Sequence, residues 1–501
     1  MLTKKLHKLL RSQSASSRVG SDVTRYAHES SPQLRCRAFL AYPFDMSRHS
    51  LRGSSHLGLP ATLLKRFAAL LAVAVFSTAA VASPQIQHWQ ASSGARVYFV
   101  ENHDLPMLDV ALDFPAGSGF DVAGKVGVAN LTFGMLDLGA QGLSEDDIAR
   151  KLADIGAQLN GQFDDDRAGL RLRTLSSAAE RDAALDILGR ILQQPVFPEA
   201  ILSREKARLV AALKEAETQP ESIADKAFSK AVFGAHPYGW YTEVADVEKI
   251  QRAELESFYR AHYGAKHAVV ALMGDITRAQ AEAIAQRLTA GLPVGDADAH
   301  IAPVMIRIQP SEQRIAHPAS QSHILMGTPG VARNDEDYFP LYVGNYILGG
   351  GGFVSRLMNE VREKRGMAYS VYSYFMPMQQ PGAFQIGLQT KKEQADESLR
   401  LVRETLHTFV DKGVSEKELR AAKHNIIGGF PLRIDSNKKI IDYLSVIGFY
   451  ELPLTYLDDF TSKVEKVTTR QIRDAFKRRI DPNALATVIV GAPEQRPGAT
   501  K

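Results

Sequence analysis

Cysteine is nearly absent from this chain of 501 residues. The one cysteine, Cys36, lies close to the N-terminus, so the chain beyond it has no disulfide bonds and no thiolate ligands for a metal ion. Histidine pairs suited to zinc are absent too, because the ten histidines after residue 82 include no H-x-x-x-H spacing. The sequence therefore excludes a disulfide scaffold and a cysteine-based zinc site, and we expect the histidines to be surface or capping residues.

Clustered positive charge is also absent once the first 82 residues are set aside. Those residues hold 12 Lys or Arg and 3 Asp or Glu, whereas the remaining chain holds 48 and 53. The remaining chain therefore carries a formal charge of −5, although the whole chain carries +4. A slightly acidic body without a basic patch does not attract nucleic acid. We exclude nucleic-acid binding on this ground.

The N-terminal region has the features of a targeting signal. Lys65 and Arg66 precede the uncharged apolar stretch 67–82, which ends in Ala-Val-Ala. A basic start, an apolar middle and small residues at the end are the three parts of a secretory signal peptide. We expect residues 1–82 to be a leader that is cleaved after Ala82, which places the mature chain in the periplasm without a membrane span. An uncleaved anchor is the alternative.

Residues 1–45 leave two further interpretations open. They are rich in Arg and Ser and poor in acidic residues, which is typical of a mitochondrial presequence. Translation from Met46 would instead give a signal peptide of more ordinary length. A mitochondrial presequence would give a different localisation from the periplasm.

The chain beyond the leader contains a long internal repeat. The segment VEKIQRAELESFYRAHYGAKHAVVALMGD, from Val247, aligns without a gap to VEKVTTRQIRDAFKRRIDPNALATVIVGA, from Val464, at an offset of 217 residues. Gly274 aligns with Gly491 at the same offset. Each segment has the pattern of an amphipathic helix followed by an apolar strand. We therefore predict that one domain occurs twice.

Strands and helices are mixed within each copy. The first copy is expected to contain two adjoining strands, ARVYFVEN and DVALDFPAGS, helices near 126–138 and 144–155, strands within 157–175, and long helices from 178 onward. The second copy repeats this order from 323 to 409. The pattern predicts an α+β fold with two tandem homologous domains, residues 83–298 and 299–501. Each domain should be an open, mostly antiparallel sheet with helices packed on one side.

A run of three carboxylates lies between two of the expected strands. Asp164, Asp165 and Asp166 together suit a hard cation such as Ca²⁺. A short connection between strands is, however, normally a solvated turn. We therefore expect an exposed turn here rather than a metal site.

The segment AGSGFDVAGKVGVANLTFGMLDLGA, residues 116–140, resembles the signature of the inverzincin zinc peptidases, the family of pitrilysin and mitochondrial processing peptidase. In that family an H-x-x-E-H helix supplies two histidine ligands for zinc and a glutamate that activates water. The matching positions here are Asn130, Phe133 and Gly134, and the position of a third ligand falls within 210–213, which holds no carboxylate. The resemblance therefore implies a degenerate zinc motif and no metal or cofactor in this chain.

The segment NYILGGGGFVSRLMNEVREKRGMAYSVYSYF, residues 345–375, resembles a second part of the same family. No G-K-[ST] follows its glycines, which excludes a Walker loop. In inverzincins a glycine-rich loop near the substrate is followed by an Arg and a Tyr seven residues apart. By this resemblance the substrate-binding residues are Gly349, Gly350, Gly351 and Gly352, and the catalytic pair is Arg362 and Tyr369.

The chemistry of peptide hydrolysis gives this pair its implied roles. A guanidinium has planar paired donors that can hold a peptide backbone in register, which suits Arg362. A phenol can stabilise the negative charge that develops on the carbonyl oxygen, which suits Tyr369. The alternatives are structural: Arg362 at a solvated helix end, and Tyr369 packed in a strand beside Val371.

Loss of the zinc residues and retention of the Arg/Tyr pair imply the non-metal subunit of a heterodimeric zinc peptidase. The resemblance then implies a homologous partner chain that brings the zinc, and a peptide as the substrate. We expect this chain to be inactive alone. The alternatives are a structural relative that assembles without cleaving, and a peptide-binding relative that captures segments by strand addition.

Overall fold

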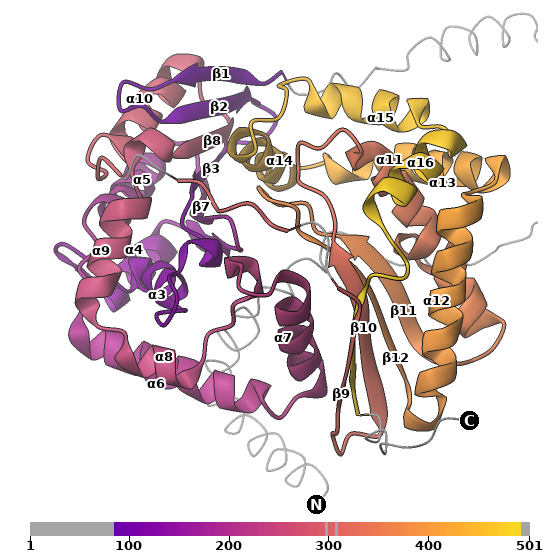
Figure 1. Ribbon diagram of the computed structural model, residues 1–501. Helices are drawn as coiled ribbons and strands as arrows, with labels where there is room; N and C mark the ends of the chain where they lie inside the picture. Colours follow the sequence, from indigo (N-terminus) through magenta and orange to yellow (C-terminus); the bar gives the residue numbers. More distant parts are fainter. Residues whose placement is uncertain (1–84, 296–298, 306–308, 492–501) are drawn as a thin grey trace, which may run out of the picture.

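The computed structural model describes residues 85–295, 299–305 and 309–491, and the predicted leader lies outside them. Figure 1 shows two halves, each with its own sheet. Among the described residues, no helix is both long and apolar enough to cross a bilayer.

The first sheet has six strands in the order β1-β2-β8-β3-β7-β6, and only the β2–β8 pair is parallel. The expectation that the first two long strands adjoin was wrong, because β8 lies between β2 and β3. All six residues of β8 are buried, and such a continuous apolar strand belongs in the middle of a sheet. The strands are β1 (Gln87–Gln90), β2 (Arg96–Glu101), β3 (Met107–Phe114), β6 (Gln158–Phe163), β7 (Ala168–Leu175) and β8 (Val269–Gly274).

The second sheet repeats the first without a counterpart of β1. Its order β9-β13-β10-β12-β11 again has one parallel pair, β9–β13, at the position of β2–β8. Gly274 ends β8 with a φ of 141°, and Gly491 follows β13 with a φ of 103°. The predicted equivalence of these two glycines is confirmed. The strands are β9 (Ser311–Ile315), β10 (Gln321–Pro329), β11 (Ala368–Phe375), β12 (Ala383–Lys391) and β13 (Ala486–Val490).

The helices of the two halves correspond at the predicted offset. In four pairs, α5/α12, α6/α13, α7/α14 and α9/α16, the first residues lie 217 positions apart. In the first half the helices are α3 (Val128–Gly134), α4 (Glu145–Asp154), α5 (Ala178–Gln193), α6 (Glu199–Ala216), α7 (Pro220–Phe233), α8 (Val244–Lys249), α9 (Arg252–His262) and α10 (Arg278–Thr289). In the second half they are α11 (Tyr338–Asn345), α12 (Ala395–Lys412), α13 (Glu416–Gly429), α14 (Asn437–Phe449), α15 (Tyr456–Lys466) and α16 (Thr469–Arg479).

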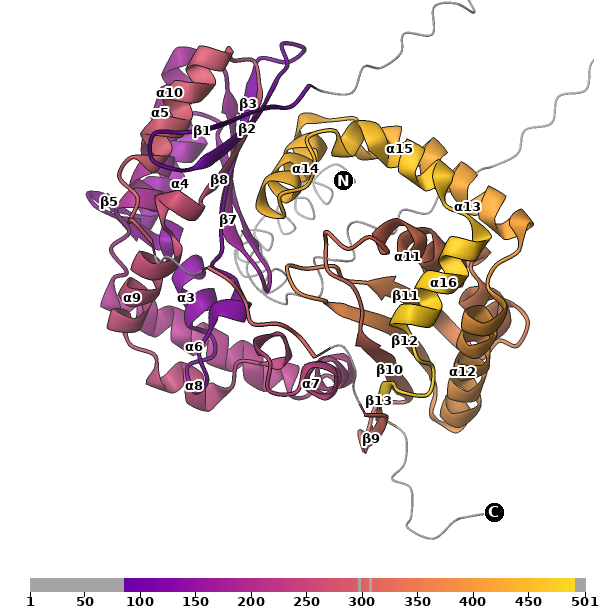
Figure 2. The ribbon, with the colours of Figure 1, turned by 45° about the horizontal axis from the view of Figure 1, so that its top comes forward.

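The two halves exchange one helix each. Figure 2 shows α14, from the second half, lying against the first sheet, while α7 from the first half packs on β10 and β13 of the second sheet. Side chains along β8 point alternately to the two faces of the first sheet, and both faces are covered. Val270 and Leu272 join the core beneath the first half's own helices, whereas Val269 and Ala271 join the core that contains α14. Each sheet thus has its own helices on one face and a helix of the other half on the opposite face.

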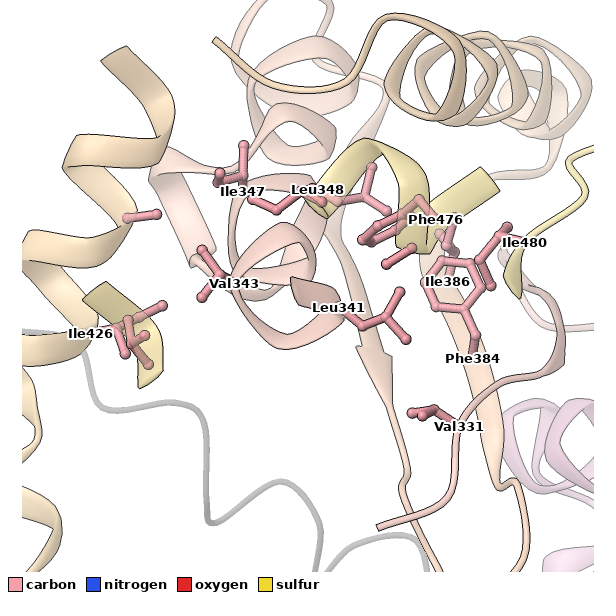
Figure 3. Close-up of a cluster of buried hydrophobic side chains, with 14 of the residues drawn as sticks. Val331, Leu341, Val343, Ile347, Leu348, Phe384, Ile386, Ile426, Phe476 and Ile480 are labelled. Atoms are coloured by element: carbon pink, nitrogen blue, oxygen red, sulfur yellow. The ribbon is translucent and has the colours of Figure 1, made fainter. Parts of the chain in front are cut away.

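The core of the second half lies under the segment that carries the predicted Arg/Tyr pair. Figure 3 shows Leu341 and Leu348 pointing toward Phe476 of α16, with Phe384 and Ile386 of β12 close by. All five side chains are almost completely buried. This packing fixes α11 and the start of the glycine-rich loop against the sheet.

Candidate functional site

The degenerate zinc motif lies on α3, a short helix of seven residues. Asn130 is partly buried and Gly134 is exposed, with open space where a side chain would stand. Helix α6 packs beside α3, as the position of a third ligand requires, but Ala211 and Ala212 face solvent there. The motif positions offer the amide of Asn130 and the phenyl ring of Phe133 but no imidazole or carboxylate, and these groups cannot form a tetrahedral zinc site. The residues at this motif therefore do not fit the metal.

Phe133 takes up the space beside α3 that a polar side chain would need. Its ring stacks on Phe163 with the ring centroids 5.3 Å apart. It also lies directly over Gly161 of β6, where an added Cβ would come within 2.2 Å of the ring. Phe133, Phe163 and Gly161 are thus packed together, which gives Phe133 a structural role. Its phenyl ring cannot accept a proton, so it cannot replace the glutamate that activates water.

The glycine-rich loop is tightly packed at its start and open at its end. After α11 the chain forms a π-helical segment, η6 (Tyr346–Gly350), and then a 3₁₀ turn, η7 (Gly352–Val354). Gly349 is buried, and a Cβ there would lie 2.5 Å from the backbone nitrogen of Ser373 on β11. Gly352 is exposed, with a φ of 60°. π-Helical turns often occur at functional sites.

Side-chain bonds fix both ends of this loop. Asn345 donates to the Ser373 carbonyl oxygen at 3.1 Å and accepts from the Ser373 hydroxyl at 2.7 Å, and both side chains are buried. After the loop, Arg356 forms two bonds with Glu418, at 2.6 and 2.8 Å. The bonds to Arg356 lower the pKa of Glu418 to about 2. The loop is therefore held between β11 and α13.

Arg362 and Tyr369 lie next to each other, as the resemblance implies. Arg362 belongs to a second π-helical segment, η8 (Met358–Glu363), and its guanidinium carbon lies 5.3 Å from the centroid of the Tyr369 ring. The ring of Phe353 lies 5.0 Å from the same carbon. Within the described part of the chain, the guanidinium has one ion-pair contact, with Glu363 at 3.8 Å. Its planar donors therefore remain available for a substrate.

Tyr369 projects from an irregularity in β11. Ala368 pairs with Thr390 and Ser370 pairs with Gln389, so that Tyr369 is an extra residue without a partner on β12. Such a β-bulge redirects a side chain and is common beside active sites. Tyr369 is 78% exposed, whereas Val371 is buried. The structural alternative, a tyrosine packed beside Val371, is not what the structure shows.

Comparisons with known proteins show the family of this chain. The family model described as insulinase (peptidase family M16) matches residues 96–244, and the peptidase M16 inactive domain matches residues 249–426. The crystal structure of a peptidase M16 inactive domain from Pseudomonas fluorescens is 37% identical, with a TM-score of 0.79, and the match covers 82% of this chain and 100% of that chain. The chain belongs to the M16 peptidase family.

Two further relatives come from Helicobacter pylori. A non-peptidase homolog, YmxG, is 26% identical over 401 residues, which cover 79% of this chain and 91% of the relative. A crystal structure described as a protease is 17% identical, with a TM-score of 0.73, and covers 81% of this chain and 99% of that chain. The second likeness supports the M16 fold alone. The inactive-domain model and the non-peptidase homolog fit an inactive M16 chain without zinc of its own.

One residue of this M16 site was missed by the sequence analysis. Phe353 is 63% exposed, and its ring centroid lies 5.0 Å from the Arg362 guanidinium carbon, in the turn that ends the glycine-rich loop. The signal was present, because a large apolar residue directly after four glycines in a solvated loop is unusual. Among the predicted substrate-binding residues, Gly349 is buried and only Gly352 is exposed. Their contact with a substrate stays a prediction.

The carboxylate run of this M16 chain is not the exposed turn that we expected. Asp166 is buried and accepts hydrogen bonds from the hydroxyls of Tyr238 and Tyr450 and from the backbone N–H of Gln379. Asp165 accepts from the Ser118 hydroxyl at 2.6 Å. Asp164 and Asp165 are partly buried, and Asp166 is enclosed by residues from both halves of the chain. Within the described residues, no cluster of three or more His, Cys, Asp or Glu is arranged to hold a metal ion.

This buried turn predicts a pH-dependent stability. Burial raises the pKa of Asp165 to about 7 and that of Asp166 to about 6, and the negative charge of Asp164 raises the pKa of both. Between pH 4 and 7 the folded state therefore holds more protons than the unfolded state. We expect the free energy of unfolding to decrease as the pH rises through this range.

Urea unfolding at several pH values tests this expectation. Asp165→Asn should make the decrease smaller between pH 4 and 7, whereas Asp182→Asn, at an exposed position on α5, should leave it as in the wild type. Asp121 also has a pKa raised to about 6 by burial, so part of the decrease should remain. An identical pH dependence in wild type and Asp165→Asn would contradict the assignment.

Proposed function

We propose that this chain is the non-metal subunit of a heterodimeric zinc metallopeptidase. The partner is a homologous chain with an intact H-x-x-E-H motif, and the substrate is a peptide. This chain contributes Arg362, Tyr369 and the glycine-rich loop 349–352 to the shared site. The signal segment 67–82 supports secretion to the periplasm, where the pair would act.

The exposed Tyr369 on its bulge carries this proposal. The bulge leaves Tyr369 without a partner on β12 and turns its side chain to solvent beside Arg362, an arrangement common next to active sites. The phenol hydroxyl can donate to the carbonyl oxygen of a peptide as negative charge develops there. The Arg362 guanidinium can donate two parallel hydrogen bonds to backbone oxygens and hold the peptide in place.

The packing around the pair supports a positioning role. The Arg362 guanidinium carbon lies 5.0 Å from the Phe353 ring centroid and 5.3 Å from the Tyr369 ring centroid, and these two contacts limit the rotation of the side chain. Asn345 and Ser373 tie the loop to the strand that carries Tyr369. A site preorganised in this way loses little entropy when the peptide binds.

A non-catalytic relative that only binds peptides is the second candidate. The observation in its favour is α3, where Phe133 and Gly134 replace the residues needed for zinc chemistry. This candidate shares the exposed Arg/Tyr pair but needs no partner chain. It predicts peptide binding without turnover under all conditions.

Reconstitution decides between the two candidates. The purified chain should not cleave a quenched fluorogenic peptide, and it should contain no stoichiometric zinc by elemental analysis. Mixed with the zinc-bearing homologue encoded in the same genome, it should form a complex on size-exclusion chromatography and cleave the peptide. Tightly bound zinc in this chain with chelator-sensitive activity alone, or no gain in turnover on mixing, would contradict the proposal.

A further inference from the structure

Arg333 is a partly buried arginine whose side chain has no hydrogen-bond acceptor among the described residues. It lies in the loop after β10, where its backbone N–H donates to the Met378 carbonyl oxygen at 2.8 Å. Its Nε is buried and has no hydrogen-bond partner. Within the described residues, its guanidinium makes no hydrogen bond or ion pair, although it lies 5.2 Å from the centroid of the Tyr450 ring.

Neighbouring arginines at the junction of the two halves are all bonded. Arg167 donates to Asp164 at 2.9 Å and to the Ser445 hydroxyl at 3.0 Å. Arg171 donates to the buried Asp113. Arg333 lies in the same region as Arg167 and Arg171, but unlike them it has no hydrogen-bond acceptor among the described residues.

The groups around Arg333 that most affect its charge are phenols and one arginine rather than carboxylates. Burial lowers the pKa of Arg333, and nearby phenol groups raise it above its ordinary value, while the like charge of Arg167 lowers it. No carboxylate is among these strongest influences on its charge. The phenol groups are those of Tyr338, Tyr450 and Tyr456. A partly buried guanidinium without a carboxylate partner within the described residues is open to an anion from outside the chain.

We infer that Arg333 binds a carboxylate group of the peptide substrate. A guanidinium presents a planar pair of N–H donors that matches the two oxygens of a carboxylate. The carboxylate can belong to the peptide's C-terminus or to an Asp or Glu side chain, and the experiment below separates these sources. This inference rests on the proposed peptide binding and adds the chemical class of the peptide.

The position of Arg333 also gives a distance along the peptide. Tyr369 lies at the start of β11, and Met378, which bonds the Arg333 backbone, follows the end of β11 at Phe375. The six steps along the strand from Tyr369 to Phe375 span about 20 Å. An extended peptide covers the same length with about six residues. The carboxylate is therefore expected about six residues from the bond placed at Tyr369.

Fluorescence anisotropy with the full mature chain alone tests this inference. The probes are one fluorescein-labelled ten-residue peptide of Gly, Ser and Leu in three forms: a free C-terminal carboxylate, a C-terminal amide, and the amide form with one internal Glu. Wild type should bind at least one carboxylate form about tenfold or more tightly than the plain amide. Arg333→Gln should remove this difference, and Arg333→Lys should restore only part of it. The form that depends on Arg333 identifies the source of the carboxylate.

Controls separate binding from structure. Arg150→Gln, an exposed arginine on α4 paired with Asp147, should bind all probes as the wild type does. Without peptide, Arg333→Gln should have a melting temperature equal to or above that of the wild type, because removal of an unpaired, partly buried charge does not destabilise the fold. A clearly lower melting temperature would show that Arg333 is a structural residue and overturn the inference.

Equal affinity of the wild type for the carboxylate and amide probes, including no measurable affinity for either, would also overturn it. The assay contains no partner chain and measures no turnover. The result of the binding assay is therefore independent of the role of Tyr369 in turnover. Loss of the Arg333 effect leaves the proposed subunit role intact, and a failure of reconstitution leaves carboxylate binding intact.

Discussion

Tyr369→Phe should lower the turnover of the reconstituted pair by about 10²- to 10³-fold. The substitution removes one hydroxyl from a side chain that is 78% exposed and lies on a bulge. The fold and the assembly should therefore not change. If the hydroxyl donates to the developing oxyanion, its loss acts on kcat more than on KM. Steady-state hydrolysis by the pair gives both constants, and size-exclusion chromatography checks assembly.

A tyrosine on the same strand provides the matched control. Tyr374→Phe removes a hydroxyl from a ring that stacks on Tyr372 farther along β11, and it should leave kcat within about twofold. Arg362→Ala should raise KM and lower kcat, since the peptide is no longer held, and Arg362→Lys should rescue poorly because an ammonium lacks paired planar donors. Wild-type turnover in both Tyr369→Phe and Arg362→Ala would make this chain a scaffold.

Gly349→Ala should have the second-largest effect, and it should act on both stability and turnover. A Cβ at this position would lie 2.4 Å from the Ser373 hydroxyl and 2.5 Å from its backbone nitrogen, so the loop and β11 must move apart. Overpacking of this kind costs about 1–3 kcal/mol in the free energy of unfolding. The movement also displaces Tyr369 relative to Arg362, and a shift of about 1 Å can lower turnover by about 10²-fold.

Urea unfolding and the peptide assay measure the two effects of Gly349→Ala. Gly428→Ala is the control, because Gly428 lies in α13 with no atom within 4 Å of an added Cβ. An alanine there should stabilise the helix by about 0.5–1 kcal/mol and leave turnover unchanged. If Gly349→Ala is as stable and as active as the wild type, the close packing of the loop on β11 has no functional role.

Local patterns in the sequence were enough to predict much of this fold. The amphipathic helices and the apolar strands β8 and β13 recur at a fixed offset. Each could be recognised because the spacing of its apolar residues reflects its own secondary structure and burial. The helix at 144–155 was also predicted closely, since Ser144 and Asp147 form a capping box that a sequence displays directly. The motif positions on α3 and the Arg/Tyr pair followed from a resemblance, and the structure brings Arg362 and Tyr369 together.

Features that depend on distant segments could not be predicted. Insertion of β8 between β2 and β3 joins residues more than 150 positions apart, and no local pattern encodes that pairing. The bulge at Tyr369 depends on the register of β11 against β12, which the alternation of side chains alone does not fix. Asp166 looked solvated because a carboxylate run normally is, yet Tyr238 and Tyr450, from the two halves, enclose it.

The exchange of α7 and α14 constrains how a peptide can enter. Gly448 brings α14 so close to the first sheet that an added Cβ would lie 2.5 Å from Val269 and 2.7 Å from Tyr98. On the other side, Phe228 of α7 is buried against the second sheet. Rotating the two halves apart would separate α14 from the first sheet and α7 from the second sheet. Apolar surface would then be exposed on both sheets and on both helices. This chain therefore behaves as a single rigid unit. In the proposed heterodimer, opening would move the whole chain relative to its partner.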